Sequence, residues 1–135
     1  MSNSRSNSVS IHKDLSQGFI LSVKVYISPA DVPRFLSLFN PAYDAVLAEA
    51  ECRFLIVAQP SSQEDENVTC LSWIEGWSKP PHWFMGVQMN KAYYESYLSE
   101  TTAMFVKPRW HEILVAEEGL CHLKLPESET TSKDM

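Results

Sequence analysis

The chain has 135 residues, of which 44% are apolar and 11% aromatic, and its formal net charge is −6. These values fit one globular domain with a modest core and exclude a disordered chain. Nucleic acids and anionic membranes are excluded as partners, because both require a positive patch and no Lys/Arg cluster interrupts the acidic balance. No apolar run approaches the roughly 20 residues of a membrane span, so we expect no membrane contact.

Both ends of the chain are predicted to be disordered tails. Residues 1–16 are polar and lack the apolar stretch of a secretory signal, and residues 126–135 are charged and poor in apolar side chains. Neither segment can offset its ordering entropy by burial. The folded domain is therefore predicted to span residues 17–125. The three cysteines cannot all pair within one chain and match no zinc spacing, so we interpret them as reduced thiols of a cytoplasmic protein.

The first predicted elements are a strand and a long helix. Residues 17–27 alternate side chains between two faces and are rich in β-branched residues, which is typical of a strand. Residues 28–31 (Ser-Pro-Ala-Asp) mark a helix start through a capping serine, a first-turn proline and an early acid. An apolar stripe at helical spacing follows from Val32 to Leu47. Pro41 lies inside this stripe and is expected to kink the helix or restart it.

A hairpin, two helices and a last strand follow. The predicted bounds are residues 52–59 and 67–77 for the strands of the hairpin, 82–89 and 91–104 for the helices, and 109–117 for the last strand. Residues 120–125 are short and apolar enough to form an additional edge strand.

The order βαββαβ predicts an α+β, ferredoxin-like fold, in which an antiparallel sheet carries its helices on one face. The central strands are apolar on both faces, since Leu71 and Trp73 alternate with Cys70 and Ile74. The chain offers no further helices for the second face, so a second copy is the economical cover and a homodimer is expected. The alternative is a monomer whose tails cover the sheet.

Several segments resemble a known family. They are ILSVKVYISPADVPRFLSLF at residues 20–39, the strand ending LSWIEGW at 71–77, and HWFMGVQMNKAYYESYL at 82–98, which leads into PRWHEILVAE at 108–117. With them, the stretch from Phe19 to Glu117 resembles the antibiotic-biosynthesis-monooxygenase family of dimeric α+β barrels, in its fungal branch. The resemblance implies a homodimer and a role in secondary metabolism. Known members include cofactor-independent oxygenases of polyketide aromatics, haem-degrading enzymes and proteins without known activity.

Two positions depart from the family pattern. An oxygenase of this family has an asparagine four residues before the strand-closing tryptophan, and here Trp73 stands at that place while Trp77 is the closing residue. Many members carry a pair of histidines in the second helical region, where Gln88 and Tyr93 stand in this chain.

Glu75 is the most informative single residue. It shares a strand face with Trp73 and Trp77, and a carboxylate between indoles loses hydration. Its pKa is therefore expected to rise, which suits a general acid or base. The alternative interpretations are an ion pair with a nearby lysine or arginine and a position at a solvated strand end.

His82 and His111 are the other candidate catalytic residues. His82 follows two prolines at a helix start and His111 lies on the last strand, and either can take a proton near neutral pH. Each is alternatively a surface or core histidine. The chain has no phosphate loop, no nucleophile elbow and no metal-ligand histidine spacing, so we predict no cofactor and no metal.

Aromatic residues are dense in the second half of the chain. Some must be core, because rings dominate burial energy, but large rings with polar tips also suit a pocket for a flat ligand. The predicted substrate-binding residues are Trp73, Trp77, Trp83, Tyr93 and Tyr94.

Three functions remain open from the sequence. The first is a cofactor-independent monooxygenase that takes a proton from a bulky aromatic or polyketide-type small molecule and lets the carbanion reduce oxygen. The second is a non-redox cyclase, isomerase or decarboxylase that uses the same base. The third is a ligand-binding dimer without catalysis.

Overall fold

A computed structural model describes residues 7–126 of the chain. Residues 1–6 of the predicted N-terminal tail, and residues 127–135 of the predicted C-terminal tail, lie outside the described residues. Among the described helices, none is long and apolar enough to cross a membrane.

The main sheet is antiparallel and has four strands in the order β3–β4–β2–β5. The strands are β2 (Phe19–Ile27), β3 (Cys52–Ala58), β4 (Thr69–Trp77) and β5 (Phe105–Leu114). The two central strands are β2 and β4, which are the first and the third of the four strands along the chain. Their pairing is typical of the ferredoxin-like fold. The predicted α+β, ferredoxin-like fold is therefore confirmed.

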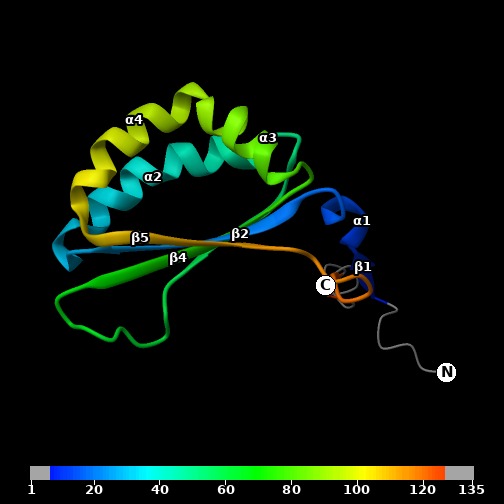
Figure 1. Cartoon of the computed structure of the whole chain (residues 1–135). Coiled ribbons are helices and arrows are strands. Elements are labelled where there is room, and N and C mark those ends of the chain that lie inside the picture. Colours follow the sequence, from blue (N-terminus) through cyan, green and yellow to red (C-terminus); the bar gives the residue numbers. More distant parts are fainter. Residues whose placement is uncertain (1–6, 127–135) are drawn as a thin grey trace, which may run out of the picture.

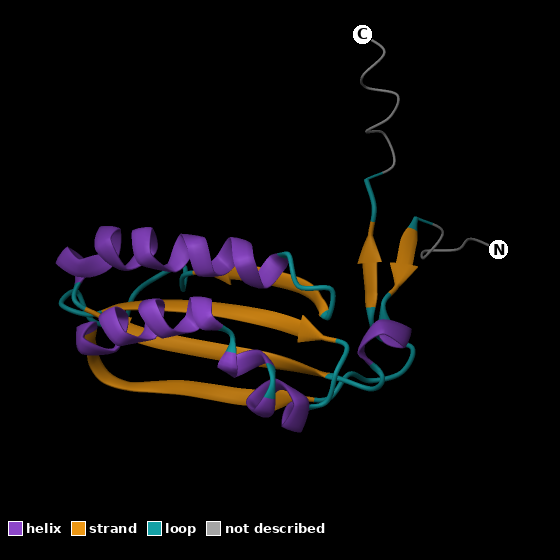
Figure 2. Cartoon of the chain, turned by 90° about the horizontal axis from the view of Figure 1, so that it is seen from above, coloured by secondary structure: helices purple, strands orange, loops and turns teal. Residues whose placement is uncertain are grey.

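The helices between β2 and β5 all cover the same face of this sheet (Figures 1 and 2). They are η1 (Pro29–Asp31), α2 (Val32–Leu47), α3 (Pro81–Gly86), η2 (Gln88–Asn90), α4 (Ala92–Thr101) and η3 (Thr102–Met104). The helix does not restart at Pro41, since α2 continues through this residue, which is exposed. Ser28 precedes η1, but its side chain forms no capping hydrogen bond.

Strand alternation places the core between the sheet and the helices. On β2 every second side chain from Phe19 to Ile27 is buried. The register pairs Val23 with Trp73 of β4, so both point toward the helices. The ring of Phe39 on α2 then packs 4.9 Å from the ring of Trp73. Burying one such side chain stabilises the fold by about 1.5–3 kcal/mol, which makes this layer the main source of stability.

The last strand begins earlier than predicted, at Phe105 rather than at residue 109. Pro108 lies inside it, and the pairing with β2 shifts register next to this point. A proline cannot donate a hydrogen bond to a neighbour, so it is tolerated in an edge strand or at an irregularity. β5 is an edge strand of the sheet, which explains how the strand extends across the proline.

The structure differs from the predicted N-terminal tail between Ser8 and Leu15. A short strand, β1 (Ser8–Ser10), pairs with β6 (His122–Lys124) in a separate two-stranded sheet, and α1 (His12–Leu15) follows it. Leu15 is only 2% exposed, so one buried side chain anchors this polar segment. The segment suggested as an additional edge strand thus pairs with the N-terminal segment and not with the main sheet (Figure 2).

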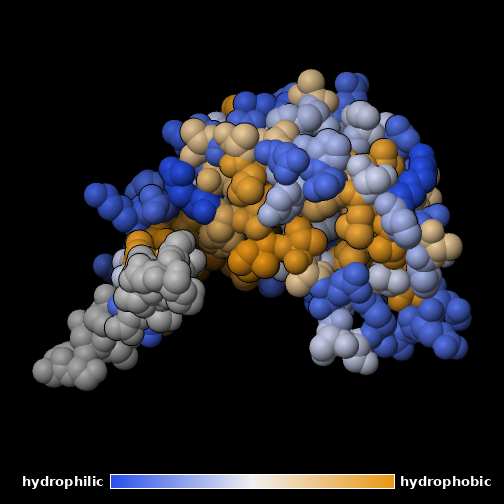
Figure 3. All heavy atoms as spheres, turned by 180° about the vertical axis from the view of Figure 1, so that it is seen from behind, coloured by the Kyte–Doolittle hydropathy of each residue, from blue (hydrophilic) through white to orange (hydrophobic). Residues whose placement is uncertain are grey.

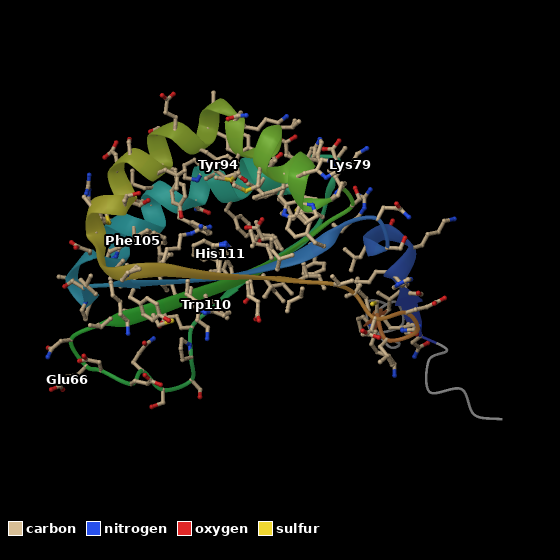
Figure 4. All side chains as sticks on the ribbon, viewed as in Figure 1. Glu66, Lys79, Tyr94, Phe105, Trp110 and His111 are labelled. Atoms are coloured by element: carbon tan, nitrogen blue, oxygen red, sulfur yellow. The ribbon has the colours of Figure 1, made fainter. Side chains whose placement is uncertain are left out.

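The face of the main sheet opposite the helices is uncovered among the described residues. Its exposed apolar side chains include Ile56, Ile74, Trp110 and Leu114, with exposed fractions of 55%, 37%, 39% and 41%. Trp110 points to this side of the sheet, whereas His111 points toward the helices (Figure 4). Seen from behind, apolar side chains also form a band across the middle of the molecule (Figure 3). The second face of the sheet thus exposes apolar side chains, as expected of a face that needs a cover, and the cover itself stays a prediction.

Gly18, which directly precedes β2, allows a test of stability. A Cβ atom added at Gly18 would lie 1.8 Å from the backbone carbonyl oxygen of Trp77, whereas one added at Gly86 would meet nothing within 4 Å. We expect Gly18→Ala to lower the free energy of unfolding by about 1–3 kcal/mol, and Gly86→Ala to change it by about 0.5 kcal/mol or less. Urea unfolding of both variants checks this, and equal stabilities would contradict the close approach at Gly18.

Candidate active site

A cavity of about 120 Å³ lies between the helices and the sheet. Its wall is largely apolar and is built from α2, α3, α4 and all four strands of the main sheet, with Phe39, Leu55 and Met89 among its residues. The polar groups on the wall are Tyr43, Glu75, Tyr94, Tyr97 and Arg109, together with the indole of Trp73. Arg109 is exposed, so the cavity reaches the surface beside β5.

The cavity has the size of a single aromatic ring. Apolar cavities of about 150 Å³ bind benzene, whereas pockets for drug-sized ligands measure about 300–1,000 Å³. A bulky molecule would therefore insert one ring and leave its remainder at the opening near Arg109.

Glu75 is buried on the cavity wall and is held by two indoles. Its side chain is 7% exposed. The Trp77 Nε1–H donates to Oε1 over 2.7 Å, and the Trp73 Nε1–H donates to Oε2 over 3.1 Å. The period-two geometry of β4 brings the three residues together, because residues 73, 75 and 77 share one face. Each carboxylate oxygen keeps a lone pair for a further hydrogen bond.

Burial raises the pKa of Glu75 above its ordinary value, although the two indole hydrogen bonds and the positive charge of Arg109 lower it in part. Desolvation disfavours the charged carboxylate more than the two donors favour it. A carboxylate with a raised pKa is a stronger base than an exposed one, so this group suits proton removal from a molecule in the cavity.

A second polar cluster lies where η2 and α4 meet the end of α2. The Tyr93 hydroxyl donates to Glu49 Oε2 over 2.7 Å, and the Gln88 Nε2–H groups donate to the hydroxyl oxygens of Tyr93 and Tyr94 over 2.7 and 3.1 Å. Burial is the first cause that raises the pKa of both tyrosines, so both remain protonated phenols. Tyr94 belongs to the cavity wall, below α4 (Figure 4).

The structure brings only some of the predicted residues to the cavity. Trp73, Glu75 and Tyr94 line it. Trp77 is fully buried behind the wall, where it donates to Glu75 and packs against the ring of Phe84.

The other predicted residues lie away from the wall. The ring of Trp83 packs 5.9 Å from that of Trp77, and Tyr93 contacts Tyr94 from the side of Glu49. His82 and His111 are exposed and do not line the cavity, although His111 lies on the helix side of the sheet.

The sequence prediction missed Arg109, Tyr97 and Gln88 as members of the site. Tyr97 and Tyr94 lie three residues apart on one helix face, a spacing that is visible in the sequence but also typical of plain core. Arg109 lies on β5, an edge strand of the sheet, and the sequence carries no signal that its side chain reaches the wall. The buried position of Gln88 depends on η2, a short turn with no sequence signal.

The described residues contain no group of three or more His, Cys, Asp or Glu side chains that could hold a metal ion. Three cysteines are free thiols, and burial raises the pKa of Cys52 to about 11.

Comparisons with solved structures identify the fold. A protein described as a candidate antibiotic biosynthesis monooxygenase from Nitrosomonas europaea matches 77% of this chain and 94% of its own, with a TM-score of 0.65 and 12% identity. The chain adopts the antibiotic biosynthesis monooxygenase fold. Proteins described in the same way from Caulobacter crescentus and Bacteroides thetaiotaomicron match with TM-scores of 0.58 and 0.60, identities of 17% and 12%, and coverage of 77% and 80% of this chain and 94% and 95% of theirs.

A fungal protein is also similar in sequence. A protein of Pestalotiopsis microspora, named as a candidate monooxygenase, is 26% identical over 91 residues, which are 67% of this chain and 71% of that protein. No family model matches the chain. The resemblance inferred from the sequence is confirmed, since proteins with the antibiotic biosynthesis monooxygenase fold are its structural neighbours.

The raised pKa of Glu75 predicts a pH dependence of stability. Between the ordinary carboxyl pKa and the raised value, folded Glu75 holds a proton that the unfolded chain releases, so stability falls as pH rises through this window. Glu75→Gln cannot titrate and lacks this component. We expect the free energy of unfolding of the original protein, relative to the variant, to decline with rising pH. Urea unfolding across the window measures this difference, and a pH-independent difference would contradict it.

Proposed function

We propose that this monooxygenase-fold protein is a cofactor-independent enzyme that removes a proton from an aromatic small molecule, in the manner of a monooxygenase of secondary metabolism. The observation that carries the proposal is the buried carboxylate of Glu75 on the wall of a ring-sized cavity. The fold and the relative named as a monooxygenase support the general kind of protein. The thiol state of the cysteines is in keeping with a cytoplasmic location.

In this proposal Glu75 takes one proton from a CH₂ group that a conjugated or adjacent carbonyl group makes acidic. The resulting carbanion reacts with molecular oxygen to form a hydroperoxide, which loses water and leaves a new carbonyl group on the ring. One oxygen atom enters the product and the other leaves as water, so the substrate supplies all the electrons. Trp73 and Trp77 hold the carboxylate, and the apolar wall excludes water.

The proposal also includes a homodimer. The face of the sheet that carries Ile56, Ile74, Trp110 and Leu114 is apolar and uncovered, and a second copy would bury it face to face. The cavity lies on the other side of the sheet, so each subunit would contain its own site.

Oxygen consumption is the direct test of the activity. With anthrone and 2-indanone as probes, we expect oxygen uptake that Glu75→Gln lowers by about 10²–10⁴-fold, the range typical of a general base. The rate should rise with pH as Glu75 loses its proton, through a midpoint above the ordinary carboxyl pKa. His82→Asn and His111→Asn, which alter exposed residues outside the cavity wall, serve as controls and should retain activity.

Deuterium exchange separates the alternative functions. The CH₂ groups of the same probes, which the carbonyl group makes acidic, are followed in D₂O without oxygen. Exchange that depends on Glu75 but is accompanied by no oxygen uptake in air would favour the non-redox isomerase or cyclase. Neither exchange nor uptake, with binding intact, would overturn the catalytic proposal in favour of a ligand-binding dimer.

The dimer is tested by one charge on the uncovered face. Ile74 is 37% exposed in the centre of that face, and Leu47 is 47% exposed at the end of α2. We expect a mass of two 15.4 kDa chains for the original protein and for Leu47→Asp, and of one chain for Ile74→Asp. Light scattering after size-exclusion chromatography measures this, and a monomeric original protein would contradict the proposal.

A further inference from the structure

We propose that Tyr94 donates a hydrogen bond to an oxygen atom of the molecule bound in the cavity, and that Glu49, Tyr93 and Gln88 are positioning residues that fix the direction of this bond. The inference deepens the proposed function and rests on it in one respect, namely that the cavity is the ligand site. It assigns a role to a cluster of buried polar groups that the chemistry at Glu75 does not use.

Glu49 is the first acceptor in a chain of hydrogen bonds, and it determines which groups of the chain donate. Its Oε1 lies 3.5 Å from Lys91 Nζ in an ion pair, and its Oε2 accepts the Tyr93 hydroxyl over 2.7 Å. A carboxylate can only accept, so the single hydrogen of the Tyr93 hydroxyl is committed to Glu49. The oxygen of Tyr93 can then only accept from any other neighbour.

Gln88 connects the two tyrosines, because its side-chain amide donates one hydrogen bond to Tyr93 and one to Tyr94. Its side chain is completely buried, and Nε2 lies 2.7 Å from the Tyr93 oxygen and 3.1 Å from the Tyr94 oxygen. If the amide were turned, its oxygen would face the lone pairs of Tyr93, whose hydrogen is already in use. The nitrogen therefore occupies this position, and its two hydrogens serve the two tyrosines.

The hydrogen of the Tyr94 hydroxyl is consequently left for a ligand. The Tyr94 oxygen accepts from Gln88, and the hydrogen bonds of the described residues include none that Tyr94 donates. Its side chain is 9% exposed and forms part of the cavity wall. Burial raises the pKa of Tyr94, which keeps the donor protonated at neutral pH. A turned Gln88 would instead accept this hydrogen, so Glu49 and Tyr93 keep the donor available.

The chemistry of the cavity defines the class of ligand. Its volume fits one aromatic ring, and its wall carries a fixed donor, Tyr94, and a buried base, Glu75. Removal of a proton next to a carbonyl group places negative charge on the carbonyl oxygen, and a preformed donor stabilises that charge. The ligand is therefore an aryl ketone or a related aromatic molecule whose oxygen is conjugated with the carbon that loses the proton.

The test compares two molecules of the same shape. Acetophenone carries a carbonyl oxygen where α-methylstyrene carries a CH₂ group, and both have one ring. We expect Tyr94→Phe to weaken the binding of acetophenone by about 2- to 10-fold, the effect of one neutral hydrogen bond, and to leave α-methylstyrene within about twofold. Isothermal titration calorimetry measures both affinities. Equal effects on the two ligands would overturn the inference.

A second measurement separates positioning from direct contact. Glu49 is not part of the cavity wall, yet Glu49→Leu removes the carboxylate that accepts the Tyr93 hydroxyl at the start of the chain of bonds. We expect this variant to move the infrared carbonyl band of bound ¹³C-acetophenone from the hydrogen-bonded frequency toward the higher frequency found with Tyr94→Phe. Glu95→Leu makes the same replacement at an exposed position of α4 and is the matched control, with no shift.

The outcomes distinguish this inference from the proposed function. A band that shifts in Tyr94→Phe but not in Glu49→Leu would overturn the positioning role. Glu75-dependent activity, combined with unchanged acetophenone binding in Tyr94→Phe, would overturn only the present inference. Failure of both ligands to bind the original protein would overturn the cavity as a ligand site and the proposed function with it.

Discussion

The geometry of one strand, β4, governs the interior of this protein. Alternation places residues 73, 75 and 77 on the helix side of the sheet, and the middle one is a glutamate. An unpaired carboxylate at this depth would be strongly unfavourable, because burial removes its hydration. The indoles on either side each supply an N–H group to one carboxylate oxygen, at 2.7 and 3.1 Å, so the same alternation that buries Glu75 also provides its partners. The cavity lies beside this group, between the sheet and the helices.

The two polar clusters of the interior have opposite characters. Around Glu75 the protein supplies donors, so the carboxylate is an acceptor with unused lone pairs. Around Tyr94 the protein supplies another donor, the amide of Gln88, so the phenol is left with an unused hydrogen. The cavity therefore has an accepting group and a donating group on its wall, within a largely apolar lining that also carries Tyr43, Tyr97 and Arg109. This pairing suits the conversion of a ketone to its enolate, in which one atom loses a proton and another gains charge.

The sequence predicted the elements whose signals are local. The alternation from Phe19 to Ile27 and from Leu71 to Trp77 is sufficient to assign two strands and their buried faces, and it also brought Trp73 and Glu75 together. The segment from Ser8 to Leu15 was missed, because its order depends on pairing with residues more than a hundred positions away. The positions of His82 and His111 outside the cavity, and of Arg109 on its wall, depend on how a turn and an edge strand are placed. Such placements are set by tertiary packing, for which periodicity carries no information.

The small sheet formed by β1 and β6 has a consequence for the connectivity of the chain. Ser8 pairs with Lys124, so the two ends of the described chain lie side by side at one end of the main sheet (Figure 2). Neighbouring ends are the geometric condition for circular permutation. A short linker across this pair, with new ends opened in the exposed loop between β3 and β4, would preserve every strand of the main sheet and every wall of the cavity. The strands of the main sheet could thus follow one another in a different order along the chain and still form the same site.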